Sequence, residues 1–498
     1  MSQPQNQPLQ VYYDKNCPVC SRFIVSVTSS KKKEYFQCQP LKDLTSNDLL
    51  SKEFHVITQD GKIYRKFDGI LKIGEMYQKW QFLITIARFP VIYQLLSFGY
   101  DIFAAHRYGI SKLFDRILLT KLVLILVLFV SFLASYPLWL SERQYPQVPV
   151  FSFLPVILFP FDYIIFITML ILLVVSFINI SKRVFLISFV CILGIYFLFD
   201  QSRLQPEFYQ FLLLSIAVSL YPWTVSNTHK KKVMLATCCI IISSIYIYSG
   251  LQKANISFIS GVYPWFVQPV IQFFPDTIKQ IIRSLGFLVP VIETGIGIGL
   301  LVKKYRLLAI AVAICMHLFI LFSLGPFGHN WNSVVWPWNI AMCCFVVILF
   351  WDTDSLAFST LVKPVQPVCV ILVILCVVLP AFSFINLWDS YLSASLYSGN
   401  TENAQIHIPA NIVYTLNPQI KKNIQKAGNN FYVLDISTWS YEAMNVPSYP
   451  QDRVFKGITK AFCKNVPVNT GITVQIQGKP NWLTGSSSTS DYTCKDLL

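Results

Sequence analysis

Two cysteines separated by two residues carry the strongest chemical signal in the sequence. The motif Cys17-Pro18-Val19-Cys20 follows an apolar run, Leu9–Tyr13, and the turn-forming residues Asp14-Lys15-Asn16. Helical apolar spacing resumes after Cys20, so we expect the motif where a strand turns into a helix. Free N–H groups and the helix dipole favour a thiolate at that position. We therefore predict a redox-active dithiol, with Cys17 as the exposed attacking thiol and Cys20 as the resolving thiol.

Two other interpretations of the cysteine pair stay open. A zinc site needs a second pair of ligands, and Cys38 and His55 are the nearby candidates in the sequence. Alternatively, the two cysteines are structural and carry no chemistry. We favour the redox interpretation and expect no metal site.

A lysine at the end of a long apolar run is the second candidate. Lys253 follows Ser249-Gly250 in the segment Tyr246–Trp265, where hydrocarbon should give way to lipid headgroups. Burial would favour the neutral amine, which can act as a base. The sequence alone favours the alternative, an interfacial lysine that keeps its ammonium group in water. Glu293 is the one charged residue of its own apolar segment, so it needs a partner, and Lys253 is one candidate.

Polar residues around the next apolar segments form the third candidate. His317 lies within an apolar segment, where a histidine is often only hydrogen-bonded in the core, and His329 and Asn332 precede the following segment. We expect Lys253, His329 and Asn332 to approach one another at one membrane face. Such a cluster would suit an amphipathic quinone together with a carbonyl or carboxylate substrate.

The composition indicates a protein that crosses a membrane several times. The chain is 54% hydrophobic and 13% charged, whereas soluble domains carry about 25% charged residues. About nine segments have the length of a membrane span. They lie near 117–140, 154–180, 183–200, 208–224, 233–250, 284–302, 306–324, 332–351 and 366–388. Residues 256–280 are interrupted by prolines, and we expect a re-entrant or interfacial element there.

Basic residues between the apolar segments set the expected orientation. Lys and Arg crowd into every second connection, which places the N-terminus in the cytoplasm and the C-terminus outside it. The net charge of +15 is explained in this way, so it does not indicate binding to nucleic acid.

Three domains follow from these patterns. Residues 8–112 have the element order of a thioredoxin-like α/β domain, residues 113–389 form a polytopic α-helical membrane domain, and residues 390–498 form a small extracytoplasmic domain of α+β or mainly β structure. Cys463 and Cys494 are the cysteines of this last domain. On an oxidising side of the membrane they would form a disulfide, and two free thiols are the alternative.

The N-terminal segment resembles the DCC-type thiol–disulfide oxidoreductase family, whose signature is Y-D-G-x-C-x-x-C. The sequence has Tyr13-Asp14-Lys15-Asn16-Cys17-Pro18-Val19-Cys20, with Lys15 in place of the glycine. The resemblance covers about the first fifth of the chain. It implies thiol–disulfide exchange at Cys17 and Cys20, Asp14 as a binding residue beside them, and protein thiols or disulfides as partners.

The membrane segments resemble the HTTM family, the membrane fold of vitamin K-dependent γ-carboxylases. The similarity covers roughly residues 113–390 and rests on the S-G-x-x-K that ends at Lys253, on Glu293, on His317 after Met316, and on the H-x-x-N from His329 to Asn332. It implies a reduced, vitamin K-like quinone, with Lys253 as the base that deprotonates it. His329 and Asn332 would then donate or accept hydrogen bonds in the site.

These observations lead to two hypotheses from different classes. The first is a membrane-bound redox protein, in which a dithiol domain is fused to a carboxylase-like, quinol-binding membrane core. Its partners would be the lipid bilayer, protein thiols or disulfides, and a quinone, but not nucleic acid. The second is a membrane transporter or an assembly scaffold in which both motifs are vestigial.

Overall fold

The computed structural model divides the chain into two compact units, Met1–Leu118 and Leu119–Leu498. Each unit has a hydrophobic core of its own. The structure describes residues 8–14, 17–28, 35–41, 53–77, 81–90, 92–94, 96–101, 104, 115–220, 228–351, 367–428, 430–464, 466 and 471–498.

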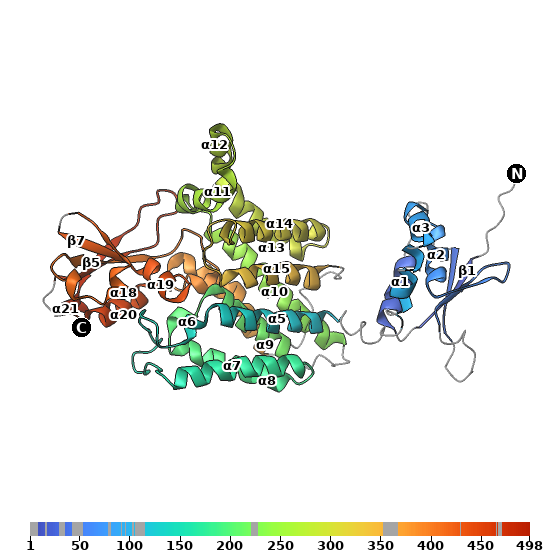
Figure 1. Cartoon of the computed structure of the whole chain (residues 1–498), viewed down its shortest axis with the longest axis horizontal. Coiled ribbons are helices and arrows are strands. Elements are labelled where there is room, and N and C mark those ends of the chain that lie inside the picture. The colour runs from blue at the N-terminus through green and yellow to red at the C-terminus, as the bar shows by residue number, and fades with distance from the viewer. Residues whose placement is uncertain are drawn as a thin grey trace. The chain divides into compact units, whose positions relative to one another are not determined.

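A four-stranded mixed sheet organises the N-terminal unit (Figure 1). Its strand order is β2-β1-β3-β4, in which β1 is parallel to β2 and antiparallel to β3. Parallel neighbours need a crossover connection, and α1 lies within the one between β1 and β2. The elements are β1 (Leu9–Tyr13), α1 (Pro18–Thr28), β2 (Phe36–Pro40), β3 (His55–Ile57), β4 (Ile63–Arg65), α2 (Lys66–Glu75) and α3 (Gln81–Ala87). The predicted α/β region is therefore confirmed.

Alternating burial along these strands explains the core of the N-terminal unit. Leu9 and Val11 of β1 are buried on one face of the strand, as the period of two requires. They pack with Ile24 of α1 and Val56 of β3 in one cluster. A hairpin completes the sheet, in which β3 and β4 pair in antiparallel register across Gly61, which has a φ of +76°.

Helices that lie side by side form most of the second unit (Figure 1). They are α5 (Arg116–Ala134), α6 (Tyr136–Trp139), α7 (Phe161–Ile178), α8 (Arg183–Leu198), α9 (Pro206–Ser219), α10 (Thr228–Gln252), α11 (Tyr263–Ile271), α12 (Asp276–Ser284), α13 (Leu288–Leu301), α14 (Arg306–Leu324), α15 (Val335–Phe350) and α17 (Pro367–Val373). Short π or 3₁₀ segments adjoin or follow them, namely η4 (Gln201–Arg203), η5 (Phe258–Val262), η6 (Leu285–Phe287), η7 (Ile374–Val378), η8 (Leu379–Ile385) and η9 (Tyr391–Ser393).

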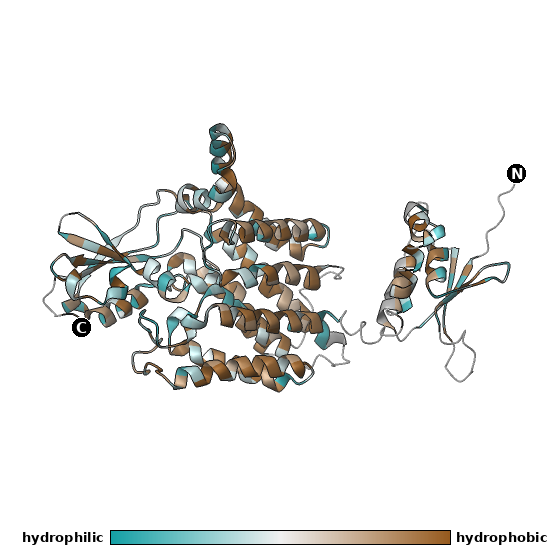
Figure 2. Ribbon diagram, viewed as in Figure 1, coloured by the Kyte–Doolittle hydropathy of each residue, from teal (hydrophilic) through white to brown (hydrophobic). Residues whose placement is uncertain are grey.

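Six of the described helical stretches are long and apolar enough to cross a membrane. They are Arg116–Ala134, Phe161–Ile178, Lys230–Gln252, Asp276–Leu301, Arg306–Leu324 and Pro367–Ile385. This finding indicates a membrane protein, and the apolar colouring of the helices in Figure 2 agrees with it.

The predicted count of nine spans is not confirmed. Three of the predicted segments correspond to shorter helices, α8, α9 and α15, of 16, 14 and 16 residues, whereas about 20 residues are needed to cross a bilayer. The expected interruption at residues 256–280 is occupied by η5, α11 and α12, so it consists of short helices.

An antiparallel sheet of five strands forms the end of the second unit. Its order is β6-β7-β5-β8-β9, and it is less apolar than the helices (Figure 2). The elements are β5 (Asn403–Pro409), η10 (Val413–Thr415), α18 (Pro418–Lys421), β6 (Ile424–Lys426), β7 (Phe431–Asp435), α19 (Ile436–Met444), α20 (Asp452–Cys463), β8 (Thr473–Gln477), β9 (Thr489–Thr493) and α21 (Cys494–Leu497). A C-terminal sheet was predicted, and the structure contains one.

Candidate functional site

The Cys17–Cys20 motif lies at the predicted junction between a strand and a helix. Cys17 directly precedes α1, and Pro18 is the first residue of that helix, a position that proline favours. The backbone N–H of Cys17 donates to the carbonyl of Asp14 at 3.2 Å. The backbone N–H of Cys20 faces the Cys17 sulfur at 3.5 Å, which is the contact that would stabilise a thiolate there.

The exposure of the two thiols differs from our expectation. Cys17 is fully buried, and Cys20 is partly exposed. The prediction of an exposed Cys17 is therefore wrong. Cys38 in β2 is half-buried, and burial raises the pKa of its thiol.

Close packing of α10 against α13 positions the second group of candidate residues. A Cβ atom at Gly250 of α10 would lie 2.6 Å from the backbone nitrogen of Thr294 and 2.8 Å from the carbonyl of Pro290. A Cβ atom at Gly297 of α13 would lie 2.7 Å from the carbonyl of Ser243. Only glycine allows these backbones to approach so closely. The approach brings the C-terminal end of α10 against the middle of α13.

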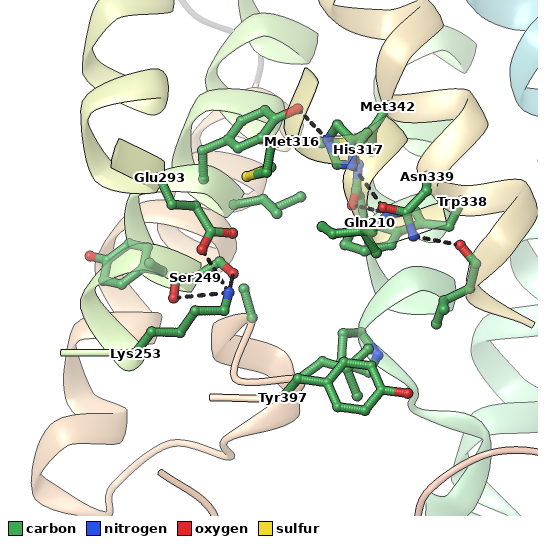
Figure 3. Close-up of a pocket in the computed structure, with 18 of the residues that line it drawn as sticks. Gln210, Ser249, Lys253, Glu293, Met316, His317, Trp338, Asn339, Met342 and Tyr397 are labelled. Atoms are coloured by element: carbon green, nitrogen blue, oxygen red, sulfur yellow. Dashed lines mark hydrogen bonds and ion pairs between the residues drawn. The ribbon is translucent and has the colours of Figure 1, made fainter. Parts of the chain in front are cut away.

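Lys253 and Glu293 meet across this helix pair (Figure 3). The Lys253 ammonium lies 2.7 Å from Glu293 Oε2 and 2.5 Å from the hydroxyl of Ser249. The side chains are 12% and 9% exposed. An apolar environment makes an isolated charge costly, so each group compensates the other. Lys253 is therefore the partner of Glu293 in the structure. Its ammonium is directed to this carboxylate and not into water.

A second polar group lies in the same helical unit, centred on His317 of α14. The hydroxyl of Tyr246 is 2.6 Å from His317 Nε2, and His317 Nδ1 is 2.8 Å from the side-chain oxygen of Asn339. The amide nitrogen of Asn339 donates to the carbonyl of Val335 at 2.8 Å. His317 is only 2% exposed, so this hydrogen-bonded chain is part of the interior.

Both polar groups line one cavity of about 360 Å³. Figure 3 shows Lys253, Ser249 and Glu293 on one side of it, and His317 and Asn339 on another. The remaining wall is largely apolar or aromatic and comes from α9, α10, η5, α11, α13, α14, α15, η7, η8 and the segment 391–397. Apolar cavities with a few convergent polar groups are typical of sites for small molecules.

His329 and Asn332 lie outside the lining of this cavity. The ring of His329 stacks on Trp265 with centroids 4.1 Å apart, and its Nε2 donates to the carbonyl of Trp265 at 2.7 Å. Asn332 donates to the hydroxyl of Tyr397 at 2.9 Å, and Tyr397 does line the cavity. The expected convergence of His329 with Lys253 is thus not what the structure contains, whereas Asn332 reaches the cavity only through Tyr397.

Several cavity residues were given no role by the sequence analysis. Tyr246 and Ser249 precede Lys253 by seven and four residues, so all three share one face at the end of α10. That helical spacing was a usable signal. Asn339 and Tyr397 gave no such signal, because their contacts to His317 and Asn332 join distant parts of the chain.

Two further features concern cysteines and metals. Cys463 and Cys494 form a disulfide that joins α20 to α21. Within the described residues, no group of three or more His, Cys, Asp or Glu side chains is arranged to hold a metal ion.

Comparison with known proteins concerns the N-terminal unit. Residues 11–113 match the family of DCC1-like thiol-disulfide oxidoreductases. The match indicates thiol–disulfide oxidoreductase chemistry and protein thiols or disulfides as substrates. It ends before the helical unit, so it does not bear on the resemblance to the carboxylase family. No curated protein and no solved structure matches the chain.

Proposed function

We propose that this protein is a membrane-bound thiol–disulfide oxidoreductase that reacts through Cys17 and Cys20. The observation that supports the proposal most directly is the placement of Cys17 before α1, with its sulfur facing the N–H of Cys20, in a segment that matches an oxidoreductase family. The proposal includes a thioredoxin-like domain at 8–112, a membrane domain at 113–389, and an extracytoplasmic domain at 390–498. The N-terminus would be cytoplasmic.

The reaction follows the usual exchange steps. The Cys17 thiolate attacks one sulfur of a substrate disulfide, forms a mixed disulfide, and releases the other substrate sulfur as a thiolate. The Cys20 thiolate then attacks the Cys17 sulfur and releases the second substrate thiolate. The enzyme ends with a Cys17–Cys20 disulfide, so two electrons have passed to the substrate. Because Cys17 is buried, a substrate must first uncover its sulfur.

Trapping the mixed disulfide tests the roles of the two cysteines. Cys20→Ser should accumulate a mixed disulfide with a peptide disulfide probe, because the resolving thiol is absent, whereas Cys17→Ser should accumulate none. Cys38→Ser is the matched control, since burial raises the pKa of this thiol and keeps it a poor nucleophile. Accumulation in Cys17→Ser instead would assign the attack to the partly exposed Cys20. Accumulation in neither variant would refute the exchange function.

The buried Lys253–Glu293 pair supports a second proposed function, binding of a reduced, vitamin K-like quinone in the cavity. The volume of about 360 Å³ is within the range of small-molecule sites, and the apolar wall suits an aromatic ring system. When bound, a quinol would supply an acidic hydroxyl and two electrons. In its most specific form, the proposal is that the bound quinol supports carboxylase-like chemistry.

The Lys253–Glu293 pair would provide the base. Glu293 Oε2 lies 2.7 Å from the Lys253 amine, so the positive charge that the amine gains with a proton is compensated by the neighbouring carboxylate. In this proposal Lys253 accepts the proton of a hydroxyl that enters the cavity. The hydroxyl of Ser249 orients the amine, because it lies 2.5 Å from Nζ.

A redox titration of the purified protein tests whether the two sites work together. The oxidation state of Cys17 and Cys20 is measured by mass-tagging of thiols, with and without a reduced naphthoquinone. A dithiol that responds to the quinol supports one redox system, in which the quinone carries electrons between the two units. A dithiol that cycles but ignores the quinol means that the units work separately.

The variant Lys253→Ala distinguishes a quinol-dependent enzyme from the alternative, a transporter or an assembly scaffold. An enzyme should lose quinol-dependent turnover per folded molecule with this change, whereas a scaffold should be little affected. Lys279→Ala is the control, because Lys279 pairs with Asp276 on α12 and does not line the cavity. Equal turnover in both variants would refute a basic role for Lys253.

A further inference from the structure

Three residues that line the cavity are also exposed on the outside of the helical unit. They are Ile292 of α13 and Cys315 and Phe319 of α14. Ile292 is 45% exposed and Phe319 is 37% exposed, whereas the other lining residues are buried or half-buried. A residue that contacts the cavity on one side and the outside on the other forms a wall one side chain thick. The cavity wall is therefore thinnest between α13 and α14.

The packing of α13 against α14 explains why the wall is thin there. The two helices are joined by the short connection 302–305, so they are antiparallel neighbours. A Cβ atom at Gly299 would lie 3.0 Å from the Cβ atom of Ala309, which means that the helices touch closely near this connection. About two turns farther along both helices, Ile292 comes level with Met316. Large, movable side chains close the wall at that level, where small residues allow direct helix contact nearer the connection.

The outer surface around this thin wall is apolar. Val291 and Leu318, the neighbours of two wall residues, are 67% and 56% exposed. Both helices belong to stretches that are long and apolar enough to cross a membrane. Glu293 and Arg306 are the charged residues of α13 and α14, and both are buried. The outside of the wall is therefore suited to hydrocarbon, because neither helix directs a charged side chain outward there.

The inside of the wall leads directly to the polar groups of the cavity. Glu293 follows Ile292 along α13, and His317 lies between Cys315 and Phe319 on α14. Exposed side chains change rotamer rapidly, so the wall can open without a movement of the helices. A molecule that passes between α13 and α14 at this level reaches the polar groups without entering water.

We propose that Ile292, Cys315 and Phe319 form a side entrance, through which the cavity takes its ligand from the hydrocarbon layer of the bilayer. The ligand class is an apolar molecule that partitions into lipid and directs its polar end to the pair of Lys253 and Glu293. This inference rests on the proposed binding function of the cavity, but not on the ligand being a quinone. It adds the route of entry and the residues that control it.

Photolabelling of the full-length protein in phosphatidylcholine vesicles tests the route. The probe is an aryl trifluoromethyl diazirine dissolved in the bilayer, which forms a carbene on irradiation and inserts into nearby side chains. Met342 reports on the interior, because it is fully buried and lines the cavity. Leu318 reports on the outer surface, because it is exposed and does not line the cavity. We expect mass spectrometry of the digested protein to find the label at both positions.

Substitutions at one wall residue test whether the probe uses the side entrance. Ile292→Trp should narrow the entrance and lower the label at Met342, relative to the label at Leu318, by about tenfold, because a larger side chain must be pressed into filled space. Ile292→Ala should widen the entrance and raise this ratio. Ile298 is the matched control, since it is an isoleucine of the same helix, is 52% exposed and does not line the cavity. Ile298→Trp and Ile298→Ala should both keep the ratio of the unmodified protein.

The outcomes separate this inference from the proposed function. An interior label that Ile292→Trp leaves unchanged would overturn the side entrance, because the probe would then enter by another route. A lack of interior label in both the unmodified protein and Ile292→Ala would overturn it as well. An interior label that depends on Ile292, in a protein that binds no naphthohydroquinone, would support the entrance and refute the quinone site. Binding of naphthohydroquinone to a cavity that the probe never enters would refute the entrance and support the quinone site.

Discussion

The two candidate sites differ in how their residues are distributed along the chain. The dithiol site consists of Cys17 and Cys20, which lie within four consecutive residues at one junction between a strand and a helix. The cavity is lined by residues from Pro206 to Tyr397, which belong to many separate helices. The dithiol site is a local site and depends only on the fold of its own turn. The cavity is an assembled site and depends on the packing of every helix that lines it. Damage to packing should therefore separate the two activities.

The largest expected effect comes from breaking the ion pair of the assembled site. Glu293→Leu leaves the Lys253 ammonium without its partner in an apolar wall, which should lower the free energy of unfolding of the helical unit by about 3–5 kcal/mol. Quinol binding should be lost. Thiol–disulfide exchange at Cys17 should continue, because that site lies in the other unit. Unfolding in mixed micelles, followed by tryptophan fluorescence, gives the stability.

A double variant provides the control for this prediction. Lys253→Met combined with Glu293→Leu removes both charges, so it should recover most of the stability that Glu293→Leu loses. If the two single changes simply add in the double variant, the contact between Nζ and Oε2 contributes nothing, and the assembled site is held by apolar packing alone.

The difference between the sites also explains what sequence reasoning can predict. The position of Cys17 and Cys20 followed from the order of a strand, a turn and a helix, all within about twenty residues. The pairing of Glu293 with Lys253 could be named as a candidate, because an isolated carboxylate in an apolar segment needs a cation. The partial exposure of Cys20 in place of Cys17 could not be predicted, since burial depends on tertiary packing and not on the local sequence pattern.

Contacts between distant helices mark the limit of that reasoning. His329 was expected beside Lys253 because both precede or follow apolar segments on one side, yet the ring of His329 stacks on Trp265. Asn339 was not assigned a role, although its side-chain oxygen lies 2.8 Å from His317 Nδ1. The shorter α8, α9 and α15 show the same limit, because apolar composition alone does not determine where a helix begins or ends.

An intermediate effect is expected from crowding the contact between α10 and α13. Gly250→Ala places a methyl group 2.6 Å from the backbone nitrogen of Thr294, so the helices must separate. We expect a loss of about 1–3 kcal/mol in the free energy of unfolding, together with weaker quinol binding, because Lys253 moves relative to Glu293. Binding is measured with the same naphthohydroquinone probe.

A matched glycine on the partner helix α13 tests this explanation. Gly295→Ala introduces a methyl group with no atom within 4 Å of it outside its own stretch of helix, so it should leave stability and binding almost unchanged. Similar losses in both variants would mean that helix flexibility, and not the close approach at Gly250, determines the geometry of the pair.

The smallest expected effect is a pH dependence confined to the second unit. Glu402 lies just before β5, and one of its carboxylate oxygens is buried without a hydrogen bond among the described residues. Burial raises the pKa of Glu402 above its ordinary value of 4.5, although Lys479 and Arg453 oppose this shift. A raised pKa means that the folded protein prefers the protonated carboxyl. Its contribution to stability is therefore complete below about pH 4.5 and is lost as the pH rises through the folded pKa.

Glu402→Gln should remove this dependence, because glutamine resembles the protonated carboxyl and does not ionise. We expect the variant to be more stable than the unmodified protein at pH 7 by less than about 1 kcal/mol, and equally stable at pH 4. Glu442→Gln on the exposed surface of α19 is the control and should show no such difference. The thiol–disulfide exchange rate should not change in either variant, since Glu402 belongs to the unit that lacks the dithiol. A gain in stability that persists at pH 4 would mean that the substitution acts through packing. The ionisation of Glu402 would then have no part in the stability of the second unit.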